Sequence, residues 1–204
     1  YSKENLASRY NLNNKQEWCV FISSFTLGNM TEEQFKKIFE SVGEEANVMR
    51  FISHESKKEV ILWFEAILVL YPNIEFIYRA HPDENLDLSL SMLVKRFKNF
   101  HLINDLSTKQ WIVVCDKIYT WYSTSLAEVF FAGKTCGILR PITIPPKYEI
   151  SIYIGSNYIK TKQDFIESFN NMETCFPIKD KTMFTYYDVK EHYPSYIRIC
   201  DVLE

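Results

Sequence analysis

The sequence predicts an α/β fold: a doubly wound, mostly parallel, Rossmann-like sheet with helices on both faces. Two observations lead to this prediction. Short apolar runs rich in β-branched and aromatic residues alternate with stretches whose apolar residues recur at helical spacing, which is typical of a parallel sheet with crossover helices. The 204 residues are 47% hydrophobic and 16% aromatic, enough to bury a core, which excludes a disordered chain. We expect one domain over residues 1–204, with its core at 15–141 and tail helices at 142–204.

The predicted strands are compact apolar runs that stop at a polar or proline-containing turn. They cover residues 18–24, 74–80, 101–104, 117–123 and 135–141. A further run at 149–154 is either a strand or an extended loop. The proline-rich segment 140–146 separates the core from this tail.

The predicted helices begin and end at recognisable signals. Thr31 with Gln34, and Ser56 with Glu59, have the spacing of a capping box, in which each side chain bonds the other residue's backbone N–H. Pro72 ends the second of these helices, because proline cannot continue the backbone hydrogen bonds. Helices are expected at residues 31–42, 56–71, 86–100, 107–115, 124–133 and 161–172, and either side of Pro194 within 188–204.

Charge, cysteine usage and hydropathy exclude several classes of protein. The net charge of −3 gives no basic field for nucleic acid, and the basic run 57–59 is expected on a solvated face. The five cysteines include no CxxC pair, so we expect reduced thiols in a cytosolic setting. The longest apolar stretch, residues 60–71, is too short to cross a bilayer and contains Glu65. No signal peptide opens the chain, which begins with Tyr1 rather than Met, so we expect a cytoplasmic piece of a longer protein.

Polar residues follow the predicted strands at the edge where such sheets bind ligands. In a doubly wound sheet the ligand lies outside the carboxyl ends of the strands, where the strand order reverses. Most of the polar side chains there carry hydroxyl groups, with one arginine and one histidine among them, which suits an anionic ligand. The residues are Ser23, Ser24, Phe25 and Thr26, then Arg79, Ala80 and His81, then Asn104 and Asp105, and finally residues 121–125.

His81 is the first candidate for contact with that ligand. Pro82 holds His81 in an extended conformation at the end of its strand. Arg79, two residues earlier, is expected on the same face of the sheet. The alternative is an ordinary turn, with His81 at the surface and Arg79 paired with Asp83 or Glu84.

The segment 123–128 contains the second candidate. Ser125 and Glu128 have capping-box spacing, so Ser125 is expected to cap the following helix and Glu128 to bond back to it. This leaves Ser123 and Thr124 ahead of the helix, where two hydroxyls can cradle a phosphate. The chain contains neither GxGxxG nor GxxxxGK[ST], which excludes a dinucleotide fingerprint and a P-loop.

Two of these segments resemble a known family. RAHP at residues 79–82, followed by CDKIYTWYSTSLAEVFFAGKTCGILRP at 115–141, is similar to the C-terminal, donor-binding half of GT-B glycosyltransferases. The resemblance is to bacterial enzymes of surface-polysaccharide synthesis that carry an HP motif and a later SS or ST motif. They include the sialyl-, polysialyl- and Kdo-transferases, which use CMP-sugars, and the CDP-glycerol polymerases. The similarity spans about residues 15–141, and residues 183–204 resemble the closing helix of such domains.

The resemblance implies roles for the residues of the two motifs. His81 would contact the donor phosphate or the nucleotide and act as the catalytic residue. The phosphate would be held by Ser123, Thr124 and Ser125. Glu128 matches the acidic residue that faces the ribose hydroxyls in many GT-B domains.

Further positions match the family less directly. Arg79 matches a basic residue often found before the HP pair, and Asn104 and Asp105 fall in the loop that usually lines the base. Many relatives have Gly or Ser where this chain has Leu126 and Ala127. That departure argues against a close backbone approach to the donor at this point.

The activity implied by the resemblance is metal-independent sugar transfer, with a CMP-sugar of the Kdo or sialic acid type as donor. The site would stabilise the charge on the departing nucleotide, and no Asp-x-Asp is present to hold Mg²⁺. The general base and the glycan or glycolipid acceptor site belong to an N-terminal domain for which 204 residues leave no room. We therefore expect a donor-binding half at the cytoplasmic side of the membrane, with contact to the membrane surface left open.

Two other interpretations remain. The first is a relative of the sugar-nucleotide 2-epimerases or the pyruvyltransferases within the GT-B fold. Epimerases also have HP after a strand, but their usual Asp-Ser-Gly-Gly helix start is absent here. The second is a non-catalytic α/β module that binds a partner protein.

Overall fold

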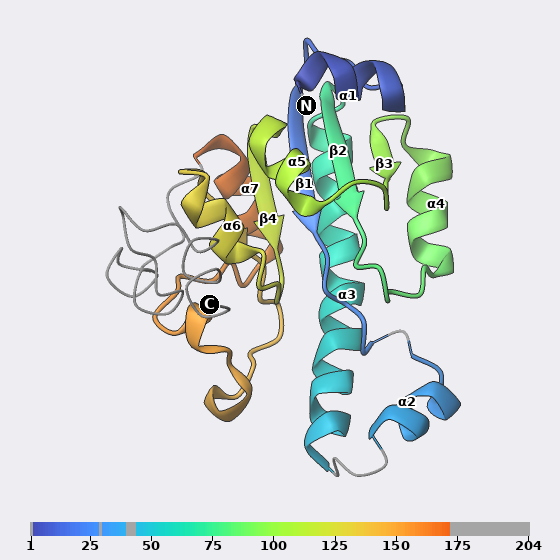
Figure 1. Cartoon of the computed structure of the whole chain (residues 1–204), viewed down its shortest axis with the longest axis vertical. Coiled ribbons are helices and arrows are strands. Elements are labelled where there is room, and N and C mark those ends of the chain that lie inside the picture. Colours follow the sequence, from blue (N-terminus) through green and yellow to red (C-terminus); the bar gives the residue numbers. More distant parts are fainter. Residues whose placement is uncertain (1, 29, 40–43, 172–204) are drawn as a thin grey trace, which may run out of the picture.

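A computed structural model of the chain describes residues 2–28, 30–39 and 44–171. Its centre is a five-stranded sheet with the strand order β3-β2-β1-β4-β5 (Figure 1). The strands are β1 (Glu17–Ile22), β2 (Ile74–Arg79), β3 (Phe100–Leu102), β4 (Lys117–Thr120) and β5 (Gly137–Ile138). Each neighbouring pair is parallel, which confirms the predicted Rossmann-like sheet.

Helices follow the strands in alternation and cover both faces of the sheet. They are α1 (Lys3–Tyr10), α2 (Glu32–Phe39), α3 (Glu44–Leu70), α4 (Leu88–Arg96), α5 (Thr108–Val114), α6 (Leu126–Phe131) and α7 (Lys162–Asn170). The buried residues of α3, α4 and α7 pack on one face, and those of α1, α5 and α6 pack on the other. Within β2, Phe76 and Tyr78 belong to the first of these cores and Ile77 to the second, as strand alternation requires.

The central strand β1 marks the point where the strand order reverses. Its last residue, Ile22, lies opposite Arg79 of β2 on one side and opposite Thr120 of β4 on the other. The carboxyl ends of all three strands therefore meet at one edge of the sheet. The N-terminal half of α3, together with α2, extends beyond this edge (Figure 1).

The long helix α3 begins well before the predicted residue 56. Ser56 is fully buried within α3, and its Oγ has no hydrogen-bond partner among the described residues, so the capping box predicted there is wrong. The preceding stretch contains Glu44 and Glu45 in its first turn and buries Ala46 and Ile52, so the helix continues through it.

The other predicted signals have mixed outcomes. The Thr31–Gln34 capping box is confirmed: the Thr31 N–H donates to Gln34 Oε1 at 3.0 Å, and the Gln34 N–H donates to Thr31 Oγ1 at 3.2 Å. The run 149–154 forms no strand but contains the 3-10 turn η2 (Ser151–Tyr153), which follows η1 (Pro146–Tyr148). The helix α1 is not among the predicted elements. The helices expected either side of Pro194 within 188–204, and the resemblance of 183–204 to a closing helix, lie outside the described residues.

Candidate functional site

A cleft of about 660 Å³ lies at the carboxyl ends of β1, β2 and β4. The loop after β2 contributes His81 to its lining, and the loop after β4 contributes Ser123 and Thr124. The structure therefore brings the two predicted motifs together in one cavity. Its position, where the strand order reverses, is the place at which doubly wound sheets bind their ligands.

The imidazole of His81 is 43% exposed and has a defined hydrogen-bonding state. The backbone N–H of Asp83 donates to His81 Nδ1 at 3.1 Å. An Nδ1 that accepts a hydrogen bond carries no proton, so the proton of the neutral ring is on Nε2. His81 can therefore donate an Nε2–H hydrogen bond to a ligand in the cleft.

The Ser123 segment forms the opposite wall and is fixed by its backbone. The Ser123 N–H donates to the hydroxyl of Tyr153 at 2.8 Å, and the same hydroxyl donates to the Ser123 carbonyl at 2.8 Å. Burial raises the pKa of Tyr153, so its hydroxyl keeps the proton that it donates. The N–H groups of Tyr122 and Ser125 donate to the hydroxyls of Ser24 and Ser123, both at 3.2 Å. Because these amides already have partners, the wall presents side-chain hydroxyls to a ligand.

Ser125 and Glu128 do not line the cleft, and the capping box predicted for them is wrong. Ser125 has a helical backbone, with φ −60° and ψ −9°, and its side chain caps no N–H. A capping side chain needs an extended residue to reach the first turn. Instead, Thr108 of α5 contacts both residues: its Oγ1 donates to Glu128 Oε2 at 2.8 Å and lies 3.4 Å from Ser125 Oγ.

Arg79 is buried away from the cleft. Its guanidinium donates to the carbonyls of Ala80 at 2.5 Å and of Leu106 at 2.7 Å, which ties β2 to the loop after β3. Burial lowers the pKa of Arg79. The predicted alternative, a pair with Asp83 or Glu84, is not formed.

Asn104 and Asp105 also lie outside the cleft lining. Asn104 is exposed. The carboxylate of Asp105 accepts hydrogen bonds from Arg9 at 2.5 Å and from the Tyr10 hydroxyl at 2.8 Å. These bonds hold α1 against the sheet, which gives Asp105 a structural contact that the sequence analysis does not predict.

Glu84, expected only as an alternative partner of Arg79, forms other contacts in this region. Its side chain is completely buried and lies 2.8 Å from the ammonium group of Lys57, which is also buried. The hydroxyls of Ser23 and Tyr78 donate to the same carboxylate at 2.5 and 2.6 Å. The expectation of a solvated face at 57–59 is thus wrong for Lys57, because α3 packs this lysine toward the loop after β2.

Arg140 lies behind the other wall within an aromatic cage. Its guanidinium carbon is 5.7 and 5.1 Å from the ring centroids of Trp121 and Tyr122, which line the cleft, and 4.7 Å from that of Tyr153. Its Nη2 donates to Glu149 at 3.1 Å. The charge of Arg140 is thereby compensated by one carboxylate and by the faces of the surrounding rings.

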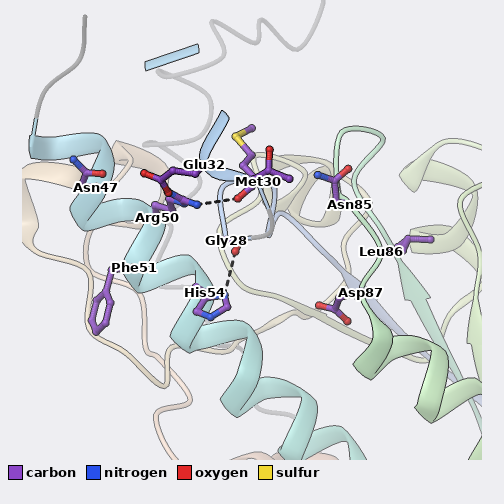
Figure 2. A pocket seen from close by; sticks show the side chains of 11 residues that line it. Gly28, Met30, Glu32, Asn47, Arg50, Phe51, His54, Asn85, Leu86 and Asp87 are labelled. Atoms are coloured by element: carbon purple, nitrogen blue, oxygen red, sulfur yellow. Dashed lines mark hydrogen bonds and ion pairs between the residues drawn. The ribbon is translucent and has the colours of Figure 1, made fainter. Parts of the chain in front are cut away.

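A second cavity of about 650 Å³ adjoins the cleft and shares Met30 and Asn85 with it. Figure 2 shows Arg50 and His54, from α3, on one side of this cavity and Asn85 on the other. Arg50 donates to Glu32 at 2.6 Å and to the Met30 carbonyl at 3.0 Å. The basic group of Arg50 is therefore already compensated by the chain itself.

The loop after β1 lies directly against α3 at Gly28, which lines the second cavity. A Cβ added at Gly28 would lie 2.8 Å from the backbone nitrogen of His54, so only glycine fits there. The Gly28 N–H donates to Ser53 Oγ at 3.1 Å. His54 Nδ1 lies 3.1 Å from the Gly28 carbonyl oxygen.

Within residues 2–28, 30–39 and 44–171, no three His, Cys, Asp or Glu side chains form a group able to hold a metal ion. None of the helices in the same ranges is both long enough and apolar enough to span a bilayer.

Comparison with known proteins places the fold. No protein-family model matches the sequence, and no curated protein does. The structure is similar to the UDP-GlcNAc 2-epimerase from Neisseria meningitidis bound to UDP-GlcNAc, with a TM-score of 0.55, 16% identity, and coverage of 98% of this chain and 48% of that one. The S. aureus MnaA–UDP complex gives a TM-score of 0.49 with 13% identity over 88% of this chain and 40% of that one.

A third structure is the Methanocaldococcus jannaschii UDP-GlcNAc 2-epimerase in complex with UDP-GlcNAc and UDP. Its TM-score is 0.48, with 14% identity over 88% of this chain and 46% of that one. This chain thus spans about half the length of each of these proteins. The likeness to the N. meningitidis enzyme concerns the fold alone, and it agrees with the Rossmann-like α/β fold that the sequence predicts.

Proposed function

We propose that this chain is the nucleotide-sugar-binding half of an enzyme and that a UDP-sugar occupies the cleft at the ends of β1, β2 and β4. The observation that carries the proposal is the presence of His81 and of Ser123 with Thr124 on two walls of one cleft. The similar epimerase from N. meningitidis holds UDP-GlcNAc, which favours the epimerase-like interpretation over a CMP-sugar transferase.

The lining of the cleft offers the chemistry that such a ligand needs. The Nε2–H of His81 and the hydroxyls of Ser123 and Thr124 can donate hydrogen bonds to phosphate oxygens, and such bonds to a charged group contribute about 1.5–3 kcal/mol each. The half-buried ring of Tyr122, which lines the cleft, offers apolar area to the base or the sugar. Donors fixed before the ligand arrives also stabilise the charge that develops on a departing nucleotide.

Calorimetric titration with UDP, UMP, CDP and CMP tests the proposal. We expect UDP to bind, and His81→Ala and Ser123→Ala to weaken binding by roughly tenfold or more, in line with the loss of one charge-assisted bond. Ser125→Ala is the matched control, because Ser125 carries the same hydroxyl two residues away but does not line the cleft.

The nucleotide preference separates the remaining interpretations. Binding of a cytidine nucleotide in preference to UDP would favour sugar transfer from a CMP-sugar, with the acceptor site and the general base on another part of the protein. Binding of none of the four would refute both enzyme interpretations and leave the non-catalytic module.

A further inference from the structure

We infer that Glu84 is the positioning residue of this cleft: its buried carboxylate fixes the segment 81–87, which carries His81 to the ligand. The inference rests on the proposed function for the ligand's identity. The claim that Glu84 fixes the segment 81–87 depends only on the contacts of Glu84.

Glu84 attaches the segment to three other elements of the fold. Oε1 accepts hydrogen bonds from Lys57 of α3 at 2.8 Å and from Tyr78 of β2 at 2.6 Å. Oε2 accepts one from Ser23, which follows β1, at 2.5 Å. One side chain therefore joins this segment to the central strand, to its neighbour and to the long helix.

The same residue also closes the turn that carries His81. The Glu84 N–H donates to the His81 carbonyl at 2.9 Å, and the His81 N–H lies 3.4 Å from Glu84 Oε2. Together with the bond from the Asp83 N–H to the ring, these contacts set both the backbone and the imidazole of His81. The position of the imidazole in the cleft thus depends on a carboxylate that the cleft itself does not expose.

The chain on either side of Glu84 faces the two cavities. Asp83 and Asn85 line the cleft, and Asn85 and Asp87 line the second cavity (Figure 2). The side chain of Glu84, between them, is 0% exposed. Glu84 therefore points into the fold, whereas Asp83 and Asn85 face the cleft.

The buried pair of Glu84 and Lys57 is better suited to fixing the position of the segment 81–87 than to stabilising the fold. Lys57 is 3% exposed and lies 2.8 Å from Glu84 and 3.0 Å from Asp87. Removing two charges from water costs free energy that their attraction only partly offsets, so a buried pair adds little net stability compared with apolar residues. What such a pair provides is a fixed arrangement of the groups around it.

The test combines a spectroscopic readout with affinity, in the full chain. Glu84→Ala removes the carboxylate and its three contacts. Glu84→Gln keeps the size of the side chain and one acceptor oxygen but removes the charge, so it still tests the inference if the alanine variant does not fold. Glu75→Gln is the matched control: Glu75 is a buried glutamate at the other end of β2, held by His101 at 2.5 Å and by the Asn13 N–H at 2.8 Å.

We expect the ring signals of ¹³C-labelled His81, assigned with His81→Ala, to shift or broaden in both Glu84 variants and to stay unchanged in Glu75→Gln. We expect Glu84→Ala in the otherwise unaltered chain to lower UDP affinity about tenfold. Added to the His81→Ala variant, the same substitution should lower it by less than threefold, because Glu84 acts through His81.

The outcomes separate this inference from the proposed function. Unchanged His81 signals in the Glu84 variants would overturn the inference, and so would an affinity loss equally large without His81. If the unaltered chain binds no UDP, the proposed function fails, while the His81 signals still decide whether Glu84 positions the segment.

Discussion

Of the two walls of the cleft, the one that carries His81 is fixed by the buried carboxylate of Glu84, whereas Ser123 on the other is fixed by the Tyr153 hydroxyl, with the Arg140–Glu149 ion pair behind it. On the first wall, the Glu84 carboxylate and the Lys57 ammonium group lie 2.8 Å apart with almost no exposure to water. On the second, the Tyr153 hydroxyl holds both the N–H and the carbonyl of Ser123.

The difference determines how each wall fails. When one member of a buried ion pair is removed, its partner is left charged and without water. The full desolvation cost of that charge then destabilises the fold. When the Tyr153 hydroxyl is removed, the Arg140–Glu149 pair stays in place, so only the bonds of that hydroxyl are lost and the rings still pack. We therefore expect the His81 wall to be the more fragile of the two.

Lys57→Met gives the largest expected effect, because it leaves Glu84 buried without a cation. We expect the free energy of unfolding to fall by about 3–5 kcal/mol, measured by urea denaturation. Lys58→Met is the control: Lys58 is 57% exposed and pairs with Glu55 at 2.7 Å, and an exposed pair contributes only about 0–1 kcal/mol. Similar losses in the two variants would contradict the contrast drawn between the walls.

Tyr153→Phe gives an intermediate effect on the other wall. The ring remains, but the Ser123 N–H loses its partner and the Ser123 carbonyl keeps only the Leu126 N–H, so we expect a loss of about 1–3 kcal/mol in the same denaturation experiment. Tyr119→Phe provides the comparison, since its hydroxyl lies 3.0 Å from that of Ser168 and does not line the cleft. A loss in Tyr153→Phe no larger than that in Tyr119→Phe would show that the Ser123 wall does not depend on these two bonds.

The smallest expected effect is a loss of stability at low pH, which should come from Asp87 on the His81 wall. Burial raises the pKa of Asp87, but hydrogen bonds from Ser89 and Leu90 and the charge of Lys57 outweigh it and lower the pKa to about 2. A carboxyl whose pKa is depressed on folding stabilises the protein above its unfolded pKa of about 3.9, and this contribution is lost as the pH falls toward 2.

The measurement is urea denaturation of the unaltered chain and of Asp87→Asn between pH 5 and pH 2. We expect the unaltered chain to be the more stable at pH 5 and the difference to shrink through this range. A constant difference would mean that the charge of Asp87 does not support the His81 wall.

The fold could be predicted because its signals are local. Strands buried on both faces, such as β1 and β2, appear as continuous apolar runs whatever they pair with. β5 is shorter than its apolar run because its length is set by pairing with β4, where only Gly137 and Ile138 find partners. The N-terminal half of α3 was missed because Ser56 resembles a helix start, although it lies inside the helix.

The candidate site could be predicted in part, for a related reason. A histidine before a proline and hydroxyls after a strand are recognisable in the sequence, and both do line the cleft. The contacts of Arg79 and Asp105 depend on the loop at Leu106 and on α1, which no local pattern connects to them. The pair of Lys57 and Glu84 gives no signal either, because charged residues predict exposure until the packing of a distant helix is known.

The central place of β1 has a consequence for how this protein is made. β1 is synthesised before the other four strands, yet one of its edges pairs only with β4, which begins at Lys117. Until that segment leaves the ribosome, β1 has an unpaired backbone edge and apolar side chains on both faces, the kind of surface on which chains associate with one another. Pairing across so long a stretch of chain is also slow, so translation speed and chaperone supply would govern the yield of this fold.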